Sequence, residues 1–368
     1  MSGISSQAGA LRVAVIVGGQ SAEREVSLRT GETVARELAG RFAVRKVEIL
    51  SSGRWVVGPA GEGPPRELDP LEALRELQRT GVDVAFNALH GPFGEDGTIQ
   101  GLFRAAGLPL TGPDVIPAAV TMDKRLAKLA MAAAGVSTPR FFALSAAEVA
   151  GEASPEGGPG WKAAVEVEGE RVPHPWIAKP SRLGSSVGCA VFAAPEAFLR
   201  EAPELVRGWP AEARRGVVLV EEFISGRELS SGVVETRGAP LVLPPVEIRT
   251  RTRRFFDYHA KYAPGETEEL CPAPLSAAET KLVQETALRV HRLFECAPLS
   301  RTDMFLTPSG AIQVLEVNTL PGMTATSLIP LSASAAGMPL ATLLAEIVEH
   351  ALSRCRRDSR DPAGPPPA

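Results

Sequence analysis

Two carboxylates, a guanidinium and an amide are spaced so that one β-hairpin would bring them together. Polar and apolar residues alternate on both sides of the turn signal Ser309-Gly310, as in half-buried strands. If the hairpin closes through this pair as a two-residue loop, Asp303 lies opposite Glu316 and Arg301 opposite Asn318. Opposed residues have Cβ atoms roughly 5 Å apart, so the two carboxylates need a cation between them. The oxygen donors favour Mg²⁺, and the alternative is a solvated polar face.

A lysine at the end of an expected strand is followed by a loop of small residues. Lys179 precedes Pro180, and residues 181–188 read Ser-Arg-Leu-Gly-Ser-Ser-Val-Gly. Glycine and serine let backbone N–H groups approach phosphate oxygens, and the lysine adds charge. The loop lacks the GxxxxGK[ST] pattern of a Walker A motif, and a flexible turn is the alternative. Together with Lys124 and the carboxylate hairpin, it favours a site for a triphosphate with magnesium.

The segment 218–228 is a strand that runs into a turn, and it could hold a nucleotide base. The backbone beside Phe223 and Ile224 could pair with an adenine edge. Glu221 could accept a hydrogen bond from the adenine amino group, and Glu228 could accept from ribose hydroxyls. An ordinary strand end is the alternative interpretation.

Near the N-terminus, residues 18–25 form a glycine-rich loop that lacks the GxGxxG pattern, so a dinucleotide site is weakly supported. Acidic Glu23 suits a ligand ammonium better than a phosphate. His90 follows the expected strand 82–89, where it is either structural or part of a site. In an α/β sheet, ligands collect at the carboxyl ends of the strands, where both residues fall.

Composition excludes several classes of protein. The chain has 368 residues, 44% of them hydrophobic, with a formal net charge of −4. The basic and aromatic run 249–262 could bind nucleic acid, but in this acidic chain a loop closing over an anionic nucleotide is favoured. The sequence has no 20-residue apolar run and no signal peptide, so we expect a cytoplasmic protein with neither a membrane nor a nucleic-acid partner. The four cysteines lack CxxC spacing and are expected to be reduced.

The order of predicted elements indicates an α/β and α+β chain. Alternating strands and helices up to about residue 118 imply a parallel, Rossmann-like sheet. Asp123 should cap a helix whose apolar stripe includes Leu126 and Leu129 and that ends at Gly135. Ser276 and Glu279 have the spacing of a capping box, which would start another helix. Other predicted strands are 13–17, 176–179 and 217–221, other helices are 27–38, 98–106, 276–294 and 339–355, and 151–175 reads as a surface insertion. The expected domains are 1–118, 119–220 and 221–356, with a disordered tail at 357–368.

Many of these segments, in this order, resemble the D-alanine–D-alanine ligases of the ATP-grasp superfamily. The resemblance extends from about Val13 to about Glu349. It rests on residues 18–27, 88–91, 94–97, 122–124, 179–181, 184–188, 257–262, 301–303, 316–319, 321–324 and 327–328. It implies an N-terminal domain followed by a two-lobed ATP-grasp fold, which phosphorylates one D-alanine and lets a second attack the acyl phosphate. It also implies ATP, two Mg²⁺ or Mn²⁺ ions, a homodimer and a role in peptidoglycan synthesis.

The resemblance also implies residue roles. Glu23 would hold the first ammonium in a network with Ser185 and Tyr262, and His90 would contact substrate. Arg301 and the Gly322 N–H would stabilise the oxyanion, while Ser327 and Leu328 would hold the second carboxylate. The implied metal ligands are Asp303, Glu316 and Asn318. The implied ATP contacts are Lys124, Lys179, Ser185, Ser186, Glu221, Glu222, Phe223, Ile224, Glu228 and Lys261.

Departures from the family pattern are modest. Phe223 stands where several relatives carry tryptophan, and Thr326 replaces a histidine of some members. Two alternatives stay open: a ligase that joins D-alanine to D-lactate, which Tyr262 disfavours, and a non-catalytic nucleotide-binding module. The complete set of polar residues on the hairpin disfavours the second.

Overall fold

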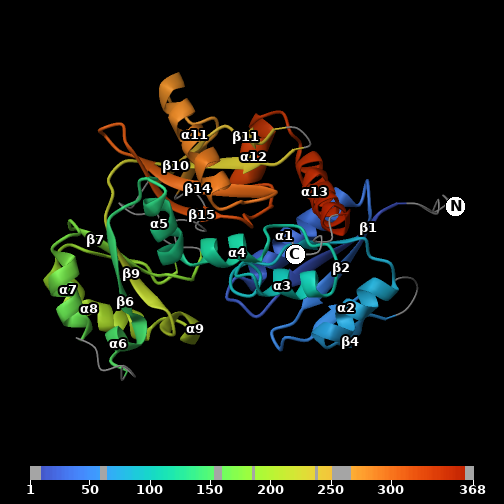
Figure 1. Ribbon diagram of the computed structural model, residues 1–368, viewed down its shortest axis with the longest axis horizontal. Helices are drawn as coiled ribbons and strands as arrows, with labels where there is room; N and C mark the ends of the chain where they lie inside the picture. Colours follow the sequence, from blue (N-terminus) through green and yellow to red (C-terminus); the bar gives the residue numbers. More distant parts are fainter. Residues whose placement is uncertain are drawn as a thin grey trace, which may run out of the picture.

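The computed structural model shows three β-sheets with helices packed around them (Figure 1). We call them the N-terminal, central and C-terminal sheets, in chain order. The structure describes residues 10–58, 64–152, 160–184, 187–236, 239–250 and 267–360. A sheet with a parallel core followed by antiparallel sheets agrees with the predicted α/β and α+β class.

The N-terminal sheet has a parallel core and an antiparallel edge. Its strands are β1 (Arg12–Gly18), β2 (Ala43–Ile49), β3 (Trp55–Val57), β4 (Arg66–Leu68) and β5 (Val84–Asn87), and its helices are α1 (Arg24–Leu38), α2 (Pro70–Arg79) and α3 (Thr98–Ala105). β1 lies between β2 and β5 and is parallel to both, whereas β3 and β4 are antiparallel. Val13 and Val15 join one apolar cluster, while Ala14 and Ile16 join another. The predicted strand is therefore confirmed as buried on both faces.

The central sheet is antiparallel and has an aromatic core. Its strands are β6 (Phe141–Ser145), β7 (Trp176–Pro180), β8 (Ala190–Phe192) and β9 (Val217–Glu222), and its helices are α6 (Ala146–Ala150), α7 (Trp161–Gly169), α8 (Pro195–Arg207) and α9 (Ala211–Arg214). Trp176 packs edge-on against Phe142 and Phe198, with ring centroids 5.3 and 5.8 Å away. The predicted surface insertion 151–175 is partly wrong, because it contributes α7 and the buried Val165 to this core.

The C-terminal sheet is formed by β10 (Arg227–Val234), β11 (Leu241–Val242), β12 (Val246–Thr250), β13 (Thr267–Leu270), β14 (Leu299–Leu306) and β15 (Ile312–Asn318). The helices that follow or interrupt these strands are α11 (Ala277–Leu293), α12 (Leu328–Ala335) and α13 (Leu340–Arg360). The predicted capping box of α11 is confirmed, because Ser276 Oγ accepts from the Glu279 N–H and the Glu279 carboxylate accepts from the Ser276 N–H. α13 runs past the predicted end at Cys355 and packs back on α1 and β5.

Two short helices, α4 (Val115–Met122) and α5 (Lys124–Ala133), lie between the sheets (Figure 1). Asp123 caps α5 as predicted, since its Oδ1 accepts from the backbone N–H groups of residues 125 and 126. The predicted apolar stripe is wrong. Leu126 and Leu129 are 37% and 48% exposed, and the buried face of α5 instead carries Lys128 and Met131. A lysine therefore occupies the core side of this helix.

Two further features bear on predictions made from composition. Within the described ranges, no single helix is long and apolar enough to cross a membrane; α12 and α13 reach that length and hydropathy only as a pair bent by 106°. All four cysteines are free thiols, as predicted.

Candidate active site

Two cavities lie between the sheets and share a wall of charged side chains. The smaller, of about 550 Å³, is bordered by the N-terminal and C-terminal sheets. The larger, of about 790 Å³, is bordered by the central and C-terminal sheets. Lys124, Asp303 and Glu316 are among the charged side chains that line both cavities, and Glu228 is another. A molecule bound in one cavity would therefore meet a molecule bound in the other at these side chains.

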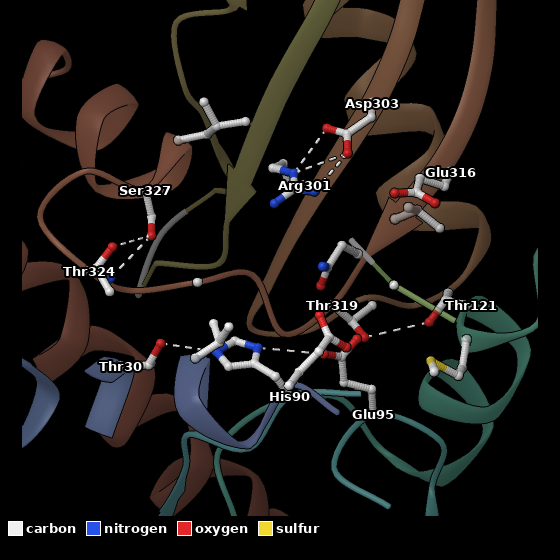
Figure 2. A pocket seen from close by; sticks show the side chains of 18 of the residues that line it. Thr30, His90, Glu95, Thr121, Arg301, Asp303, Glu316, Thr319, Thr324 and Ser327 are labelled. Carbon is white, nitrogen blue, oxygen red and sulfur yellow. Dashed lines mark hydrogen bonds and ion pairs between the residues drawn. The ribbon is translucent and has the colours of Figure 1, made fainter. Parts of the chain in front are cut away.

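The hairpin of β14 and β15 places the predicted carboxylate pair at the shared wall. Asp303 pairs with Glu316, and Arg301 pairs with Asn318, so the predicted register is confirmed. Figure 2 shows the two carboxylates on neighbouring strands, with Arg301 turned toward Asp303. The alternation of side chains along a strand is what puts all four on one face.

The predicted two-residue loop of this hairpin is wrong, and a β-bulge reconciles the loop with the register. Leu306 pairs with Ile312, which is one residue out of step with a loop closed at 309–310. Leu315 is the extra, unpaired residue that restores the pairing of Asp303 with Glu316. In the register set by the turn alone, Glu316 would face the opposite side of the sheet. With the bulge, Leu315 and Glu316 both line the larger cavity.

Each carboxylate of the pair is held by a cation. Arg301 donates from Nε to Asp303 Oδ1 (2.9 Å) and from a terminal nitrogen to Oδ2 (2.7 Å), a bidentate contact. Ser230 Oγ donates to Asp303 Oδ1 at 2.7 Å. Lys124 Nζ lies 3.1 Å from Glu316 Oε2. Burial alone lowers the pKa of Arg301, but the neighbouring carboxylates outweigh it and raise that pKa above its ordinary value, so the guanidinium stays charged.

The same wall offers oxygen donors that fit magnesium. Asp303, Glu316 and Asn318 all line the smaller cavity, and Asn318 Oδ1 accepts from the Leu320 N–H at 2.8 Å. Across the described ranges, no group of three or more His, Cys, Asp and Glu side chains could hold a metal ion by itself. Two carboxylates with an amide suit Mg²⁺, which usually completes its shell with water and substrate phosphates.

A buried group of three charges stands beside the larger cavity. Glu221 Oε2 lies 2.8 Å from Lys179 Nζ, and Oε1 lies 3.0 Å from Lys128 Nζ. Lys128 is 0%, Glu221 1% and Lys179 8% exposed. Burial lowers the pKa of Lys128 to about 8, against the opposing effect of Glu221. The two lysines in turn hold the pKa of Glu221 below its usual value, although burial opposes them. The carboxylate predicted to contact adenine thus fixes the position of Lys179.

The rest of the larger cavity is an apolar slot followed by polar residues. Phe223, Ile224 and Leu315 contribute apolar walls, and Glu222 and Glu228 line the same cavity. The backbone beside Phe223 was predicted to pair with an adenine edge. The Phe223 N–H is not available for that pairing, because it already donates to the Pro175 carbonyl at 2.8 Å. Glu222 Oε1 accepts from the Arg140 N–H at 2.8 Å, so this side chain also braces β6.

At the other end of the smaller cavity, Glu23 lies against two glycines. A Cβ atom at Gly91 or Gly184 would stand 2.8 or 3.0 Å from Glu23 Oε2, so glycine at both positions lets this carboxylate pack closely against the backbone. His90 is buried, with Nε2 3.0 Å from Thr30 Oγ1 (Figure 2). This contact joins the segment after β5 to α1. The sequence predicted that Glu23 and His90 would both lie at the carboxyl ends of the strands, and the structure places them there.

A tight loop closes the cavity at the start of α12. A Cβ at Gly322 would come within 2.9 Å of Ser327 Oγ, so the chain approaches closely there. Ser327 Oγ lies 2.8 Å from Thr324 Oγ1 and accepts from the Thr324 N–H at 3.2 Å. Leu328 is the first residue of α12, and the free N–H groups of a helix start attract anions.

Four predicted site residues, Ser185, Ser186, Lys261 and Tyr262, lie outside the described residues.

Two family models match consecutive parts of the chain. One, described as the D-ala D-ala ligase N-terminus, matches residues 12–113, and the other, the D-ala D-ala ligase C-terminus, matches residues 130–349. The chain belongs to the D-alanine–D-alanine ligase family. It is 36% identical over 344 residues to the D-alanine–D-alanine ligase of Syntrophotalea carbinolica, which covers 93% of this chain and 97% of that one. It is 38% identical over 348 residues to the D-alanine–D-alanine ligase of Xanthobacter autotrophicus, covering 93% of this chain and 98% of that one.

Solved structures agree with this membership. A Bacillus anthracis D-alanine–D-alanine ligase complexed with ATP superposes with a TM-score of 0.72 at 26% identity, covering 95% of this chain and 99% of that one. The VanG D-Ala:D-Ser ligase of Enterococcus faecalis superposes with a TM-score of 0.74 at 30% identity, covering 93% of this chain and 99% of that one. The ATP-grasp fold and the class of ADP-forming ligases follow from the family.

Lys128 and Glu95 are among the residues of this ligase-family site that sequence reasoning missed. Lys128 lies four residues after Lys124 on α5, so both can reach the same side of that helix, which was the available signal. Glu95 lines the smaller cavity, and its Oε1 accepts from the Gly91 N–H at 2.9 Å. Its segment, 94–97, was part of the family resemblance, but the residue itself was given no role.

Proposed function

We propose that the protein joins two D-alanines into D-alanyl-D-alanine, with cleavage of ATP to ADP and phosphate, for peptidoglycan precursors. The observation that carries this proposal is the shared wall, where Asp303 and Glu316 border both cavities. A nucleotide in the larger cavity and an amino acid in the smaller one would meet there. Carboxylates, cations and hydroxyl groups line the smaller cavity, and these suit a zwitterion.

ATP would lie in the larger cavity, with its base in the apolar slot and its phosphates at the shared wall. Phe223 can offer its ring to the adenine. Lys124 and Lys179 supply positive charge to the phosphates, and Glu221 contributes by holding Lys179. The full proposed set of ATP contacts is Lys124, Lys179, Ser185, Ser186, Glu221, Glu222, Phe223, Ile224, Glu228 and Lys261.

Magnesium would be held by Asp303, Glu316 and Asn318, and we propose two ions, for which manganese can substitute. Bound there, the ions would neutralise charge on the phosphates. Arg301 and Lys124 already hold the two carboxylates in place. The protein's own contribution is therefore a donor set fixed before the ligands arrive.

In the first step, a carboxylate oxygen of the first D-alanine attacks the γ-phosphorus of ATP. The bond from that phosphorus to the bridging oxygen breaks, and ADP leaves behind an acyl phosphate. Glu23 would bind the ammonium of this substrate in a network with Ser185 and Tyr262. His90, fixed by Thr30, would border the same position.

In the second step, the uncharged amine of the second D-alanine attacks the acyl carbon, and phosphate leaves as the peptide bond forms. Arg301 and the Gly322 N–H would stabilise the oxyanion that develops. The contact with Asp303 holds the guanidinium rigidly, so little reorganisation is needed. Ser327 and the Leu328 N–H would bind the carboxylate of the second substrate.

One coupled assay tests the proposal. Purified protein with ATP and Mg²⁺ is given D-alanine, D-lactate or D-serine, alone and in pairs, and both ADP and the joined product are measured. D-alanine alone should give rapid ADP release and D-alanyl-D-alanine. A depsipeptide as the main product from the D-alanine and D-lactate pair would favour the D-lactate alternative. Nucleotide binding without D-alanine-dependent ADP release would favour the non-catalytic module.

The proposal extends to assembly and location. From the family resemblance, we propose a homodimer that acts in the cytoplasm. Sedimentation equilibrium at assay concentrations should give twice the mass of the chain. A monomer would contradict this part of the proposal and leave the chemistry standing.

A further inference from the structure

One face of α1 borders the smaller cavity and carries charges of opposite sign at its two ends. Glu23, Val26, Arg29 and Thr30 from this part of the chain line the cavity. Their spacing of three or four residues puts them on one side of a helix. Thr30 is buried against His90, so Arg29 is the charged group at the far end of this face.

Arg29 differs from the other described cations of the cavity in having no partner among the described residues. Lys124 is paired with Glu316 and donates to the Leu183 carbonyl at 2.8 Å, and Arg301 is committed to Asp303. Arg29 is exposed, and in the part of the chain that the structure describes it makes neither an ion pair nor a hydrogen bond. A guanidinium that borders a polar cavity without a counter-ion is ready to bind an anionic group.

The cavity presents other anion-binding groups from its C-terminal side. Thr324, Thr326 and Ser327 carry hydroxyl groups, and Leu328 begins α12. In the view of Figure 2, Thr30 of α1 lies on the same side of the cavity as Thr324 and Ser327, away from Asp303 and Glu316. Arg29 lines the same cavity, so it would add a full positive charge to the hydroxyl groups and the helix start that attract a carboxylate there.

The spacing along α1 matches the length of a zwitterionic dipeptide. Six positions separate Glu23 from Arg29, which is about 9 Å along a helix axis. A fully extended dipeptide spans at most about 7 Å between its ends. The long arginine side chain can cover the difference. An ammonium held at Glu23 thus leaves the opposite carboxylate within reach of Arg29.

We propose that Arg29 is a specificity-determining residue that binds the α-carboxylate of the amine acceptor, the second amino acid. This rests on the proposed function, which places the first ammonium at Glu23. Arg29 would favour acceptors that carry a carboxylate over acceptors in which that group is neutral. Because the carboxylate is present in both ground and transition states, Arg29 acts on acceptor binding and not on the chemical step.

The test is steady-state kinetics of the full chain with ATP and Mg²⁺, comparing Arg29→Gln, Arg29→Lys and the control Arg36→Gln. Arg36 lies on α1, is exposed and pairs with Glu37, away from the cavity. For Arg29→Gln, the KM for the second D-alanine should rise about 10- to 100-fold, the range for losing a charge-assisted hydrogen bond. Its kcat, the KM for ATP and the KM for the first D-alanine should change less than about twofold. Lysine should restore most of the loss.

A second readout uses D-alaninamide as the acceptor, with the product separated by mass. The unmodified protein should prefer D-alanine to D-alaninamide, and Arg29→Gln should narrow that preference while Arg36→Gln leaves it intact. An unchanged acceptor KM in Arg29→Gln, a fall in kcat alone, or an equal effect of Arg36→Gln would overturn the assignment. If the unmodified protein makes no dipeptide, the proposed function falls and takes this inference with it. Normal dipeptide synthesis with a normal Arg29→Gln variant overturns the inference alone.

Discussion

Replacing Glu221 by glutamine would leave two buried ammonium groups without their counter-charge. Glu221 lies 3.0 Å from Lys128 and 2.8 Å from Lys179, and it is 1% exposed. Even with this carboxylate present, burial lowers the pKa of Lys128 from 10.5 to about 8, which corresponds to about 3 kcal/mol against its charged form. Removing one partner of a buried ion pair generally costs about 3–5 kcal/mol. We expect Glu221→Gln to lower the free energy of unfolding by that amount at pH 7.

The pH dependence of this loss has a definite sign. Without Glu221, the lowered pKa of Lys128 should fall further, and the pKa of Lys179 should lose a contribution that now raises it, so the folded protein would bind fewer protons. Stability then rises with pH in the window between the folded and unfolded pKa values. In the unaltered protein, Lys128 gives this window as about 8 to 10.5. The loss of unfolding free energy in Glu221→Gln should therefore be larger at pH 7 than at pH 8 or 9, and should shrink as the pH is raised toward 10.

The assay is urea unfolding followed by tryptophan fluorescence, at pH 7, 8 and 9. Trp161, Trp176 and Trp209 all belong to the cluster of the central sheet, so the signal reports mainly on that region. Lys128→Met is the matched control, because it leaves Glu221 paired with Lys179 and puts an apolar side chain of similar size in the core; it should cost less than about 1.5 kcal/mol. A loss below about 1 kcal/mol for Glu221→Gln, or an equal loss for Lys128→Met, would refute the reasoning.

Three other outcomes follow from the site and its surroundings. Arg301→Lys keeps the charge but loses the planar fork, so kcat should fall at least about 100-fold while the KM for ATP stays within about threefold; a raised KM for ATP with intact kcat would contradict the proposed role. Glu316→Gln should lower turnover by about 100-fold across a magnesium titration, and near-normal activity would remove Glu316 from the metal site. Burial lowers the pKa of His291 from 6.5, against the contrary effect of Glu235, so the folded state binds fewer protons and the free energy of unfolding should fall as pH drops through 6.5. Denaturation between pH 5 and 7 should show a shallower slope for His291→Gln, and an equal slope would assign the effect to other groups.

Signals that depend on neighbouring residues predicted local structure well. The cap at Asp123 and the capping box at Ser276 are confirmed, because each involves hydrogen bonds within a single helical turn. The strand at 13–17 is confirmed too, since five consecutive apolar residues suit a strand buried on both faces. None of these predictions required knowledge of a distant segment.

The helix α5 shows where periodicity fails. Leu126 and Leu129 suggested the buried stripe, yet the core side carries Lys128. A buried lysine is tolerable only where an opposite charge meets it, and that charge comes from Glu221 on β9. The sequence of the helix contains no sign of this partner, so the pattern of apolar residues alone pointed to the wrong face.

The site itself divides in the same way. The sequence by itself determined that Arg301 shares a face of its strand with Asp303, and Glu316 with Asn318, because the alternation of a strand is a local property. It also determined the family, through short segments in a fixed order. Only the tertiary structure decided the bulge at Leu315 that brings Glu316 to the face of Asp303, the pairing of Lys124 with Glu316, and the position of Arg29 beside the smaller cavity. These depend on distances between segments far apart in the chain, and burial and Coulomb energies are set by those distances and not by the order of residues.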